Sequence, residues 1–160
     1  MRIAGIVRDS IVDGPGVRDV IFTQGCPHHC SGCHNQDTWE MNGGEVRLSG
    51  SILRELSDSQ NDITISGGEP LSQWSALLRL LELISEQTDK RVWLYTGYTV
   101  DLNQNFYKVL ARYVDVIVDG KFVEELKDPD LLFRGSSNQR LVDIKASVEC
   151  GEIIEWEECD

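Results

Sequence analysis

The sequence predicts an α/β fold whose strands are mainly parallel. Short apolar runs rich in β-branched residues alternate with segments whose apolar residues recur at the helical period, and the order strand, loop, helix repeats along the chain. Such units place strands side by side in parallel, joined by right-handed crossovers. A chain of 160 residues can form one domain with a hydrophobic core but not two large ones.

Five segments are predicted as strands. Residues 17–22 run into a loop that contains three cysteines, and residues 62–66 are β-branched and end at Gly67-Gly68. The other three strands are predicted over residues 91–95, 114–118 and 139–144.

Helices are predicted between these strands. The clearest spans residues 72–86, with Ser72 as a natural N-cap. Its apolar residues recur at the helical period and are Trp74, Leu77, Leu78, Leu81 and Ile84. Weaker helices are predicted to begin at Ser51 and Asn103.

Four segments follow the predicted strands and are expected to meet. In parallel α/β folds, sites form at the C-terminal ends of the strands. This rule brings together the cysteine loop, Gly67-Gly68-Glu69, Thr96-Gly97 and Asp119-Gly120 on one rim.

Composition excludes several classes of protein. The formal net charge is −12 and no Lys/Arg cluster is visible, so we expect no binding to nucleic acid. No run approaches the roughly 18 apolar residues of a membrane span, and the start of the chain does not resemble a signal peptide. We therefore expect a cytoplasmic protein without a membrane partner, in which thiols stay reduced and serve metal or redox chemistry.

Charge is concentrated at the C-terminal end. The last twelve residues, ECGEIIEWEECD, carry six acidic residues and no Lys or Arg. We expect a main domain over residues 1–144 and a solvated, acidic C-terminal tail over residues 145–160.

Three of the five cysteines, Cys26, Cys30 and Cys33, lie within eight residues. A structural zinc site needs four ligands, which one of the nearby histidines could complete, but a second Cys/His pair is not evident. A [4Fe-4S] cluster held by three thiolates keeps one iron open for a small chelating group, such as an amine with a carboxylate. The spacing Cys-x3-Cys-x2-Cys resembles the signature of the radical S-adenosylmethionine (SAM) superfamily, and the ISGGEP segment strengthens this resemblance.

The resemblance is closer to one family within that superfamily. DGPGVR (13–18) and HNQDTW (34–39) are similar to activases of glycyl radical enzymes. WLYTGY (93–98) and VDGKFVEELKDPDLLFRGSSNQR (118–140) resemble the activating proteins of anaerobic (class III) ribonucleoside-triphosphate reductases. The similarity covers roughly residues 5–142, and His34, which follows the third cysteine, is instead typical of activases of pyruvate formate-lyase.

The resemblance implies a fold, two cofactors and an activity. The fold would be a shortened, open partial (β/α) barrel, and the activase domain would be residues 1–144. A reduced [4Fe-4S] cluster would cleave SAM to a 5′-deoxyadenosyl radical, which would abstract hydrogen from a glycine in a loop of the anaerobic reductase. A reduced donor such as flavodoxin would supply the electron. The protein would then be an oxidoreductase that binds and orients its cofactors.

The resemblance also assigns residues to this site. Cys26, Cys30 and Cys33 would bind three irons, and no catalytic side chain is expected beyond the cluster and SAM. The residues expected around SAM are Gly32, Cys33, His34, Gly67, Gly68 and Glu69, with Glu69 accepting a hydrogen bond from the SAM amine.

For several residues near the predicted SAM site, the sequence leaves two possible roles open. Asp119 and Lys121 are expected either to contact SAM or to form a surface turn, and Arg134 is similarly situated. Residues 13–16 are expected to form a turn near the partner's glycine loop, or a simple turn. His28 and His29 are expected to be exposed to solvent. Two alternatives for the whole chain are an activase of pyruvate formate-lyase and a non-enzymatic zinc module.

Overall fold

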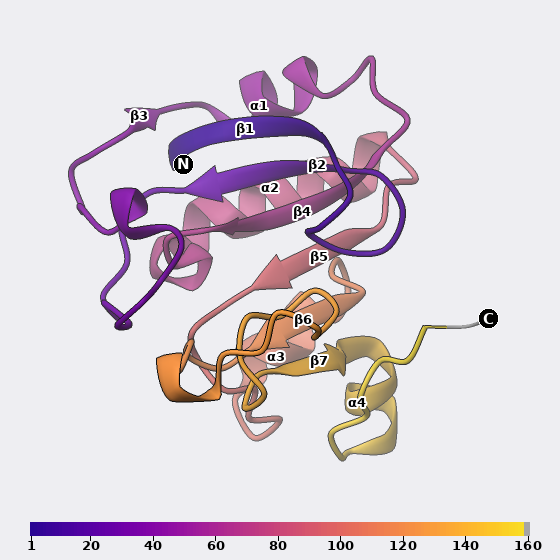
Figure 1. The fold of residues 1–160 in the computed structure, drawn as a ribbon. Helices are drawn as coiled ribbons and strands as arrows, with labels where there is room; N and C mark the ends of the chain where they lie inside the picture. The colour runs from indigo at the N-terminus through magenta and orange to yellow at the C-terminus, as the bar shows by residue number, and fades with distance from the viewer. Residues whose placement is uncertain (159–160) are drawn as a thin grey trace.

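The computed structural model describes residues 1–158, which form a mixed α/β fold around one seven-stranded sheet (Figure 1). The sheet has the strand order β3-β1-β2-β4-β5-β6-β7. The strands are β1 (Arg2–Ser10), β2 (Arg18–Thr23), β3 (Glu45–Val46), β4 (Asp62–Gly67), β5 (Val92–Tyr95), β6 (Val116–Asp119) and β7 (Arg140–Asp143). The α-helices are α1 (Ser49–Glu55), α2 (Trp74–Gln87), α3 (Asn105–Leu110) and α4 (Ile144–Cys150), with 3-10 turns η1 (Gln36–Thr38), η2 (Pro70–Gln73) and η3 (Glu124–Leu126).

The centre of the sheet is parallel and its edges are antiparallel. Strands β2, β4, β5 and β6 run parallel to one another, as predicted. Strand β7 lies at the predicted position but runs antiparallel to β6, so the expectation of parallel strands is wrong there. The connection between β6 and β7 contains only the short turn η3 and returns to the rim from which it started, whereas a parallel strand requires a crossover to the opposite rim.

Strands β1 and β3 were not predicted from the sequence. β1 pairs antiparallel with both β2 and β3, and its register with β2 is interrupted between Ile3 and Gly5 and again between Val7 and Ser10. Because these irregularities break the alternation of apolar and polar residues, the sequence of β1 lacks the period-two pattern of a strand.

The two faces of the sheet have different coverings. Ile63, Ile65 and Leu94 on one face belong to the main hydrophobic core, to which all four α-helices contribute residues. Trp93 and Val118 on the other face belong to a smaller cluster, against which Phe133 and Trp156 pack from outside the sheet. Alternate residues along β5, β6 and β7 therefore serve two separate apolar clusters.

The predicted helices form with shifted boundaries. The segment predicted to begin at Ser72 starts instead as η2, for which Glu69 is the N-cap because its side chain accepts from the backbone N–H of Leu71. Pro70 occupies the first turn, where its missing N–H costs no hydrogen bond. Helix α2 then begins at Trp74.

The beginning of the acidic tail folds onto the sheet. Helix α4 is N-capped by Asp143, whose carboxylate accepts from the N–H of Ala146. Beyond it, the backbone returns beside β7, since Asp143 N donates to Ile154 O at 3.0 Å and Trp156 N donates to Leu141 O at 2.7 Å. None of the helices in the described part of the chain is long and apolar enough to cross a membrane.

Candidate functional site

The cysteine loop extends from the C-terminal end of β2, at one rim of the parallel strands (Figure 1). Its base is closed by two backbone hydrogen bonds, from Gly25 N to Thr38 O at 2.7 Å and from Cys26 N to Trp39 O at 3.1 Å. The loop therefore leaves the sheet and returns to it within a short span, with all three predicted cysteines between its ends.

The three cysteines are free thiols that differ in burial. Cys26 is buried, while Cys30 and Cys33 are half-buried. Burial raises the pKa of the Cys26 thiol, with the neighbouring Glu69 and Cys30 charges acting in the same direction. Cys33 N donates to Cys30 O at 3.2 Å, and Asn35 N donates to the sulfur of Cys33 at 3.4 Å.

The side chains of this loop do not converge on one point. Among residues 1–158, no three side chains of His, Cys, Asp or Glu gather as ligands of a single metal ion. A structural zinc site needs four ligands around one ion, and the described residues do not present such a set. Three separate thiols on one loop, one of them buried, fit a polynuclear iron–sulfur cluster, in which different thiolates bind different irons.

The glycine pair after β4 packs against the base of the cysteine loop. Gly68 N donates to Thr23 O and Glu69 N donates to Gly25 O, both at 2.8 Å. A Cβ on Gly67, which has φ +96°, would lie 2.6 Å from Thr23 N, and one on Gly68 would collide with the carbonyl oxygen of Gly25. Close approach of the chain's own backbone is thus a sufficient reason for both glycines.

Glu69 is fully buried and joins the other two rim segments. Its carboxylate accepts from the hydroxyl of Thr96 at 2.9 Å, from Gly97 N at 2.8 Å and from Nε2 of His28 at 2.8 Å. The predicted meeting of the cysteine loop, the glycine pair and Thr96-Gly97 is therefore observed. The expectation that His28 is exposed is wrong, since only 6% of its side chain is accessible, whereas His29 is exposed and stacks on Trp39.

Gly32 and His34 lie on the outer part of the loop. Gly32 has φ +71°, and a Cβ there would lie 2.7 Å from Cδ of Glu124, so this position favours glycine. The Glu124 carboxylate also accepts from the hydroxyl of Ser31 at 2.6 Å. His34 is exposed, with its ring centroid 6.1 Å from that of Phe122. The segment after β6 thus borders the cysteine loop.

Asp119, at the end of β6, is already paired within the protein. It is buried, accepts from Nε of Arg140 at 3.0 Å and accepts from Val100 N at 2.7 Å. Lys121 is exposed, and Arg134 donates to the carbonyl of Gln139 while its Nε atom is buried without a partner among the described residues. Of these residues, Asp119 has a structural role in holding the rim.

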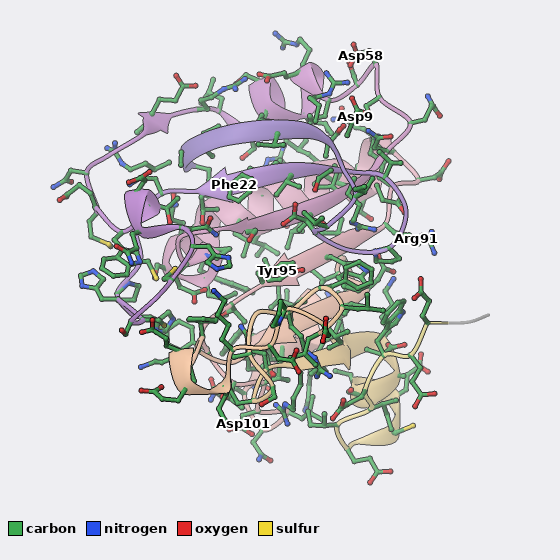
Figure 2. The ribbon with its side chains drawn as sticks, in the orientation of Figure 1. Asp9, Phe22, Asp58, Arg91, Tyr95 and Asp101 are labelled. Atoms are coloured by element: carbon green, nitrogen blue, oxygen red, sulfur yellow. The ribbon has the colours of Figure 1, made fainter. Side chains whose placement is uncertain are left out.

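The Asp13–Gly16 turn lies before β2, at the opposite rim from the cysteines. Arg18, which follows it, is buried and donates to Thr64 Oγ1 and Ile63 O, both at 2.7 Å. Figure 2 shows Arg91, which precedes β5, at this end of the sheet, far from the cysteine loop. Tyr95, labelled nearer the centre, belongs to the strand that leads from this rim to Thr96.

Comparison with known proteins identifies the family. A family model described as a 4Fe-4S single cluster domain matches residues 12–142. The chain is 40% identical over 138 residues to an anaerobic ribonucleoside-triphosphate reductase-activating protein of Vibrio cholerae, with 81% of this chain and 89% of the relative covered. It belongs to the family of anaerobic ribonucleoside-triphosphate reductase-activating proteins.

Other members of this family are similarly close. The activating protein of Escherichia coli K12 is 40% identical over 138 residues, with 81% of this chain and 90% of the relative covered. That of Enterobacteria phage T4 is 36% identical over 139 residues, with 81% and 86% covered. The match to the 4Fe-4S domain includes all three loop cysteines and ends within β7, before α4.

Proposed function

We propose that this chain is a radical SAM activase that generates a glycyl radical on anaerobic ribonucleoside-triphosphate reductase. The observation that carries the proposal is the position of Cys26, Cys30 and Cys33 on one loop at the rim of the parallel strands, beside the glycine pair. Membership of the family supports the partner, because the relatives are named as activating proteins of that reductase.

Two cofactors would occupy the rim. Cys26, Cys30 and Cys33 would hold a [4Fe-4S] cluster and leave one iron open to the amine and carboxylate of SAM. When bound, the cluster and SAM together supply one-electron reduction and hydrogen abstraction. The residues proposed to surround SAM are Gly32, Cys33, His34, Gly67, Gly68 and Glu69.

The chain's own residues would bind and orient the two cofactors and shelter them from water. The buried position of Cys26 keeps one face of the loop out of water, while the half-buried Cys30 and Cys33 remain accessible from outside. The bonds from Gly68 N to Thr23 O and from Glu69 N to Gly25 O hold the glycine pair against the end of β2 and the base of the cysteine loop. No side chain is assigned a catalytic role beyond the cluster and SAM.

Four adjacent parallel strands with helices on one face suit a shortened, open partial barrel of the radical SAM type, with residues 1–144 as the activase domain. A barrel that is open on one side admits a protein loop as substrate. We further propose a cytoplasmic location and a reduced donor such as flavodoxin.

The test is radical formation on the partner. Anaerobically reconstituted protein is mixed with SAM, a reductant and the anaerobic reductase, and a glycyl doublet is sought by electron paramagnetic resonance (EPR). We expect iron and sulfide in the activase, and a doublet that disappears when the reductase's radical glycine is changed to alanine. Ribonucleotide reduction by this chain without the reductase, or zinc in place of iron, would reject the proposal.

A further inference from the structure

The carboxylate of Glu69 has no free acceptor position. Oε1 accepts from Leu71 N and from Thr96 Oγ1, both at 2.9 Å. Oε2 accepts from Gly97 N and from His28 Nε2, both at 2.8 Å, and is also 3.0 Å from Thr96 Oγ1. A carboxylate offers about four lone-pair sites, and this fully buried one uses all of them within the protein.

His28 lies between two of the cluster cysteines and fits a tight space. It follows Cys26 by two residues and precedes Cys30 by two. Its ring packs edge-on against Tyr98, with centroids 4.6 Å apart and planes at 73°. A Cβ on Gly97 would collide with the imidazole, so the glycine at that position makes room for it.

Few hydrogen bonds connect the middle of the cysteine loop to the rest of the protein. For residues 27–33, within the described part of the chain, the hydrogen bonds to residues outside the loop (24–39) are His28 to Glu69 and Ser31 to Glu124. The Ser31 bond is exposed, whereas the His28 bond is largely sheltered, since 6% of the His28 side chain and none of the Glu69 side chain is accessible. The buried bond is therefore the stronger constraint on where the loop sits.

We propose that Glu69 and His28 form a positioning pair that fixes the cysteine loop against the end of β5, and that Glu69 is not a direct ligand of the SAM amine. The inference rests on the proposed function and changes the part that Glu69 plays in it. The Glu69 carboxylate accepts hydrogen bonds from Thr96 and Gly97 after β5. Its further bond to His28 holds the part of the loop between Cys26 and Cys30 against these residues. Groups behind the ligands of a metal centre commonly orient those ligands in this way.

The first test uses the full chain without metal. Alkylation of Cys26 by iodoacetamide, followed by mass spectrometry, reports whether the loop still shelters this buried thiol. We expect His28→Ala to speed alkylation about tenfold, and Gly97→Ala to do the same by displacing the imidazole. His28→Gln should restore most of the protection, because its amide can donate to Glu69. His29→Asn is the control, since His29 is exposed and Asn tolerates its φ of +48°.

The second test uses the reconstituted protein. SAM affinity is measured by equilibrium dialysis, alongside the EPR spectrum of the reduced cluster with and without SAM. We expect His28→Ala and Glu69→Gln both to weaken SAM binding about tenfold and to alter the spectrum even without SAM, with His28→Gln close to wild type.

Three results would contradict the proposal that Glu69 and His28 act as a positioning pair. Wild-type alkylation of Cys26 in His28→Ala would show that the loop is held by other contacts. Wild-type SAM affinity in His28→Ala would remove its role toward the cofactor. Loss of SAM affinity in Glu69→Gln alone, with an unchanged spectrum before SAM is added, would make Glu69 a direct ligand. A wild-type protein that binds neither cluster nor SAM would reject the proposed function, while the alkylation experiment would still decide the pair.

Discussion

One missing carbon atom at position 68 allows two backbone segments to meet. Gly68 lies where the chain leaves β4, and a Cβ there would collide with the carbonyl of Gly25, which immediately precedes Cys26. Backbone atoms cannot rotate away as a flexible side chain can. The glycine pair thus supports the cysteine loop directly, whether or not SAM also requires its small size.

Gly68→Ala should therefore disturb the cluster as well as SAM binding. We expect unfolding to become easier by about 1–3 kcal/mol, as for other overpacked sites, and iron content after reconstitution to fall. Gly50→Ala is the matched control, because nothing lies within 4 Å of a Cβ at that position in α1. Urea unfolding measures the change in stability, and iron analysis measures how much cluster is bound. Normal iron content together with weak SAM binding would show that the added methyl group does not displace the cysteine loop.

The three loop cysteines should be indispensable and Cys150 dispensable. Cys26→Ala, Cys30→Ala and Cys33→Ala should each reduce iron from about four per chain to near zero and abolish SAM cleavage. Cys150 is exposed and belongs to α4, which lies across the molecule from the cysteine loop (Figure 1), so Cys150→Ala should retain both. Cys159 lies outside the described residues, and Cys159→Ala is likewise expected to retain them. Iron loss from either tail variant equal to that of the loop variants would contradict ligation by three cysteines.

The sequence predicts some of these residues and not others, for a physical reason. The cysteine spacing and the glycine pair are local patterns, so they can be read along the chain. The contact between His28 and Glu69 joins residues 41 positions apart and depends on how β2 and β4 pair. The only sequence signals for it were the small residue at Gly97 and the glutamate that follows the glycine pair after β4, and neither identifies a partner.

At the scale of elements, the position of a strand in the sequence was easier to predict than its neighbours and its direction in the sheet. The parallel strands β2, β4, β5 and β6 are almost entirely buried because both of their faces are covered, and β5 and β6 contain continuous apolar runs. β1 has exposed residues and an irregular register, so its pattern is weak. The antiparallel direction of β7 depends on the path of a long connection, which no short window of sequence specifies.

The acidic tail illustrates how composition can hide structure. Trp156 packs edge-on against Trp93, with ring centroids 5.0 Å apart, and lies 6.4 Å from Phe133. Six acidic residues in the last twelve suggested a solvated end, yet one tryptophan and backbone bonds to β7 hold the described part against the sheet. The functional boundary at residue 144 stays a prediction.

Trp156→Ala should lower the free energy of unfolding by about 1–3 kcal/mol, less than for a fully buried tryptophan because Trp156 is only partly buried. Trp156→Phe should recover much of the loss, since it preserves an aromatic edge against Trp93. Denaturant unfolding followed by circular dichroism measures both. An unchanged midpoint for Trp156→Ala would mean that the tail contributes nothing to stability.

At the scale of the whole molecule, the tail and the cysteine loop lie at opposite ends of the strands. Glu157 and Glu158 border a hollow shared with Pro15, Asp62 and Arg91 at the N-terminal rim. The negative charges of Glu157 and Glu158 are thus kept away from the rim where the cysteines lie, and where a partner's glycine would have to approach. The segment after β6 lies beside this rim, where Glu124 contacts Ser31 and Phe122 lies near His34 of the cysteine loop.

The segment after β6, together with residues 93–98, resembles activators of the anaerobic reductase, whereas a histidine at position 34 is typical of activases of pyruvate formate-lyase. His34 lies on the cysteine loop and the segment borders it, with the rings of His34 and Phe122 6.1 Å apart, but the two resemblances predict different partners. We expect the segment, which is much larger, to decide, so that the reductase acquires a glycyl doublet by EPR while pyruvate formate-lyase acquires little or none under the same anaerobic conditions. Changing the radical glycine of each enzyme to alanine gives the baseline. His34→Tyr should leave this preference unchanged, and a doublet of equal size in both enzymes would show that neither feature selects the partner.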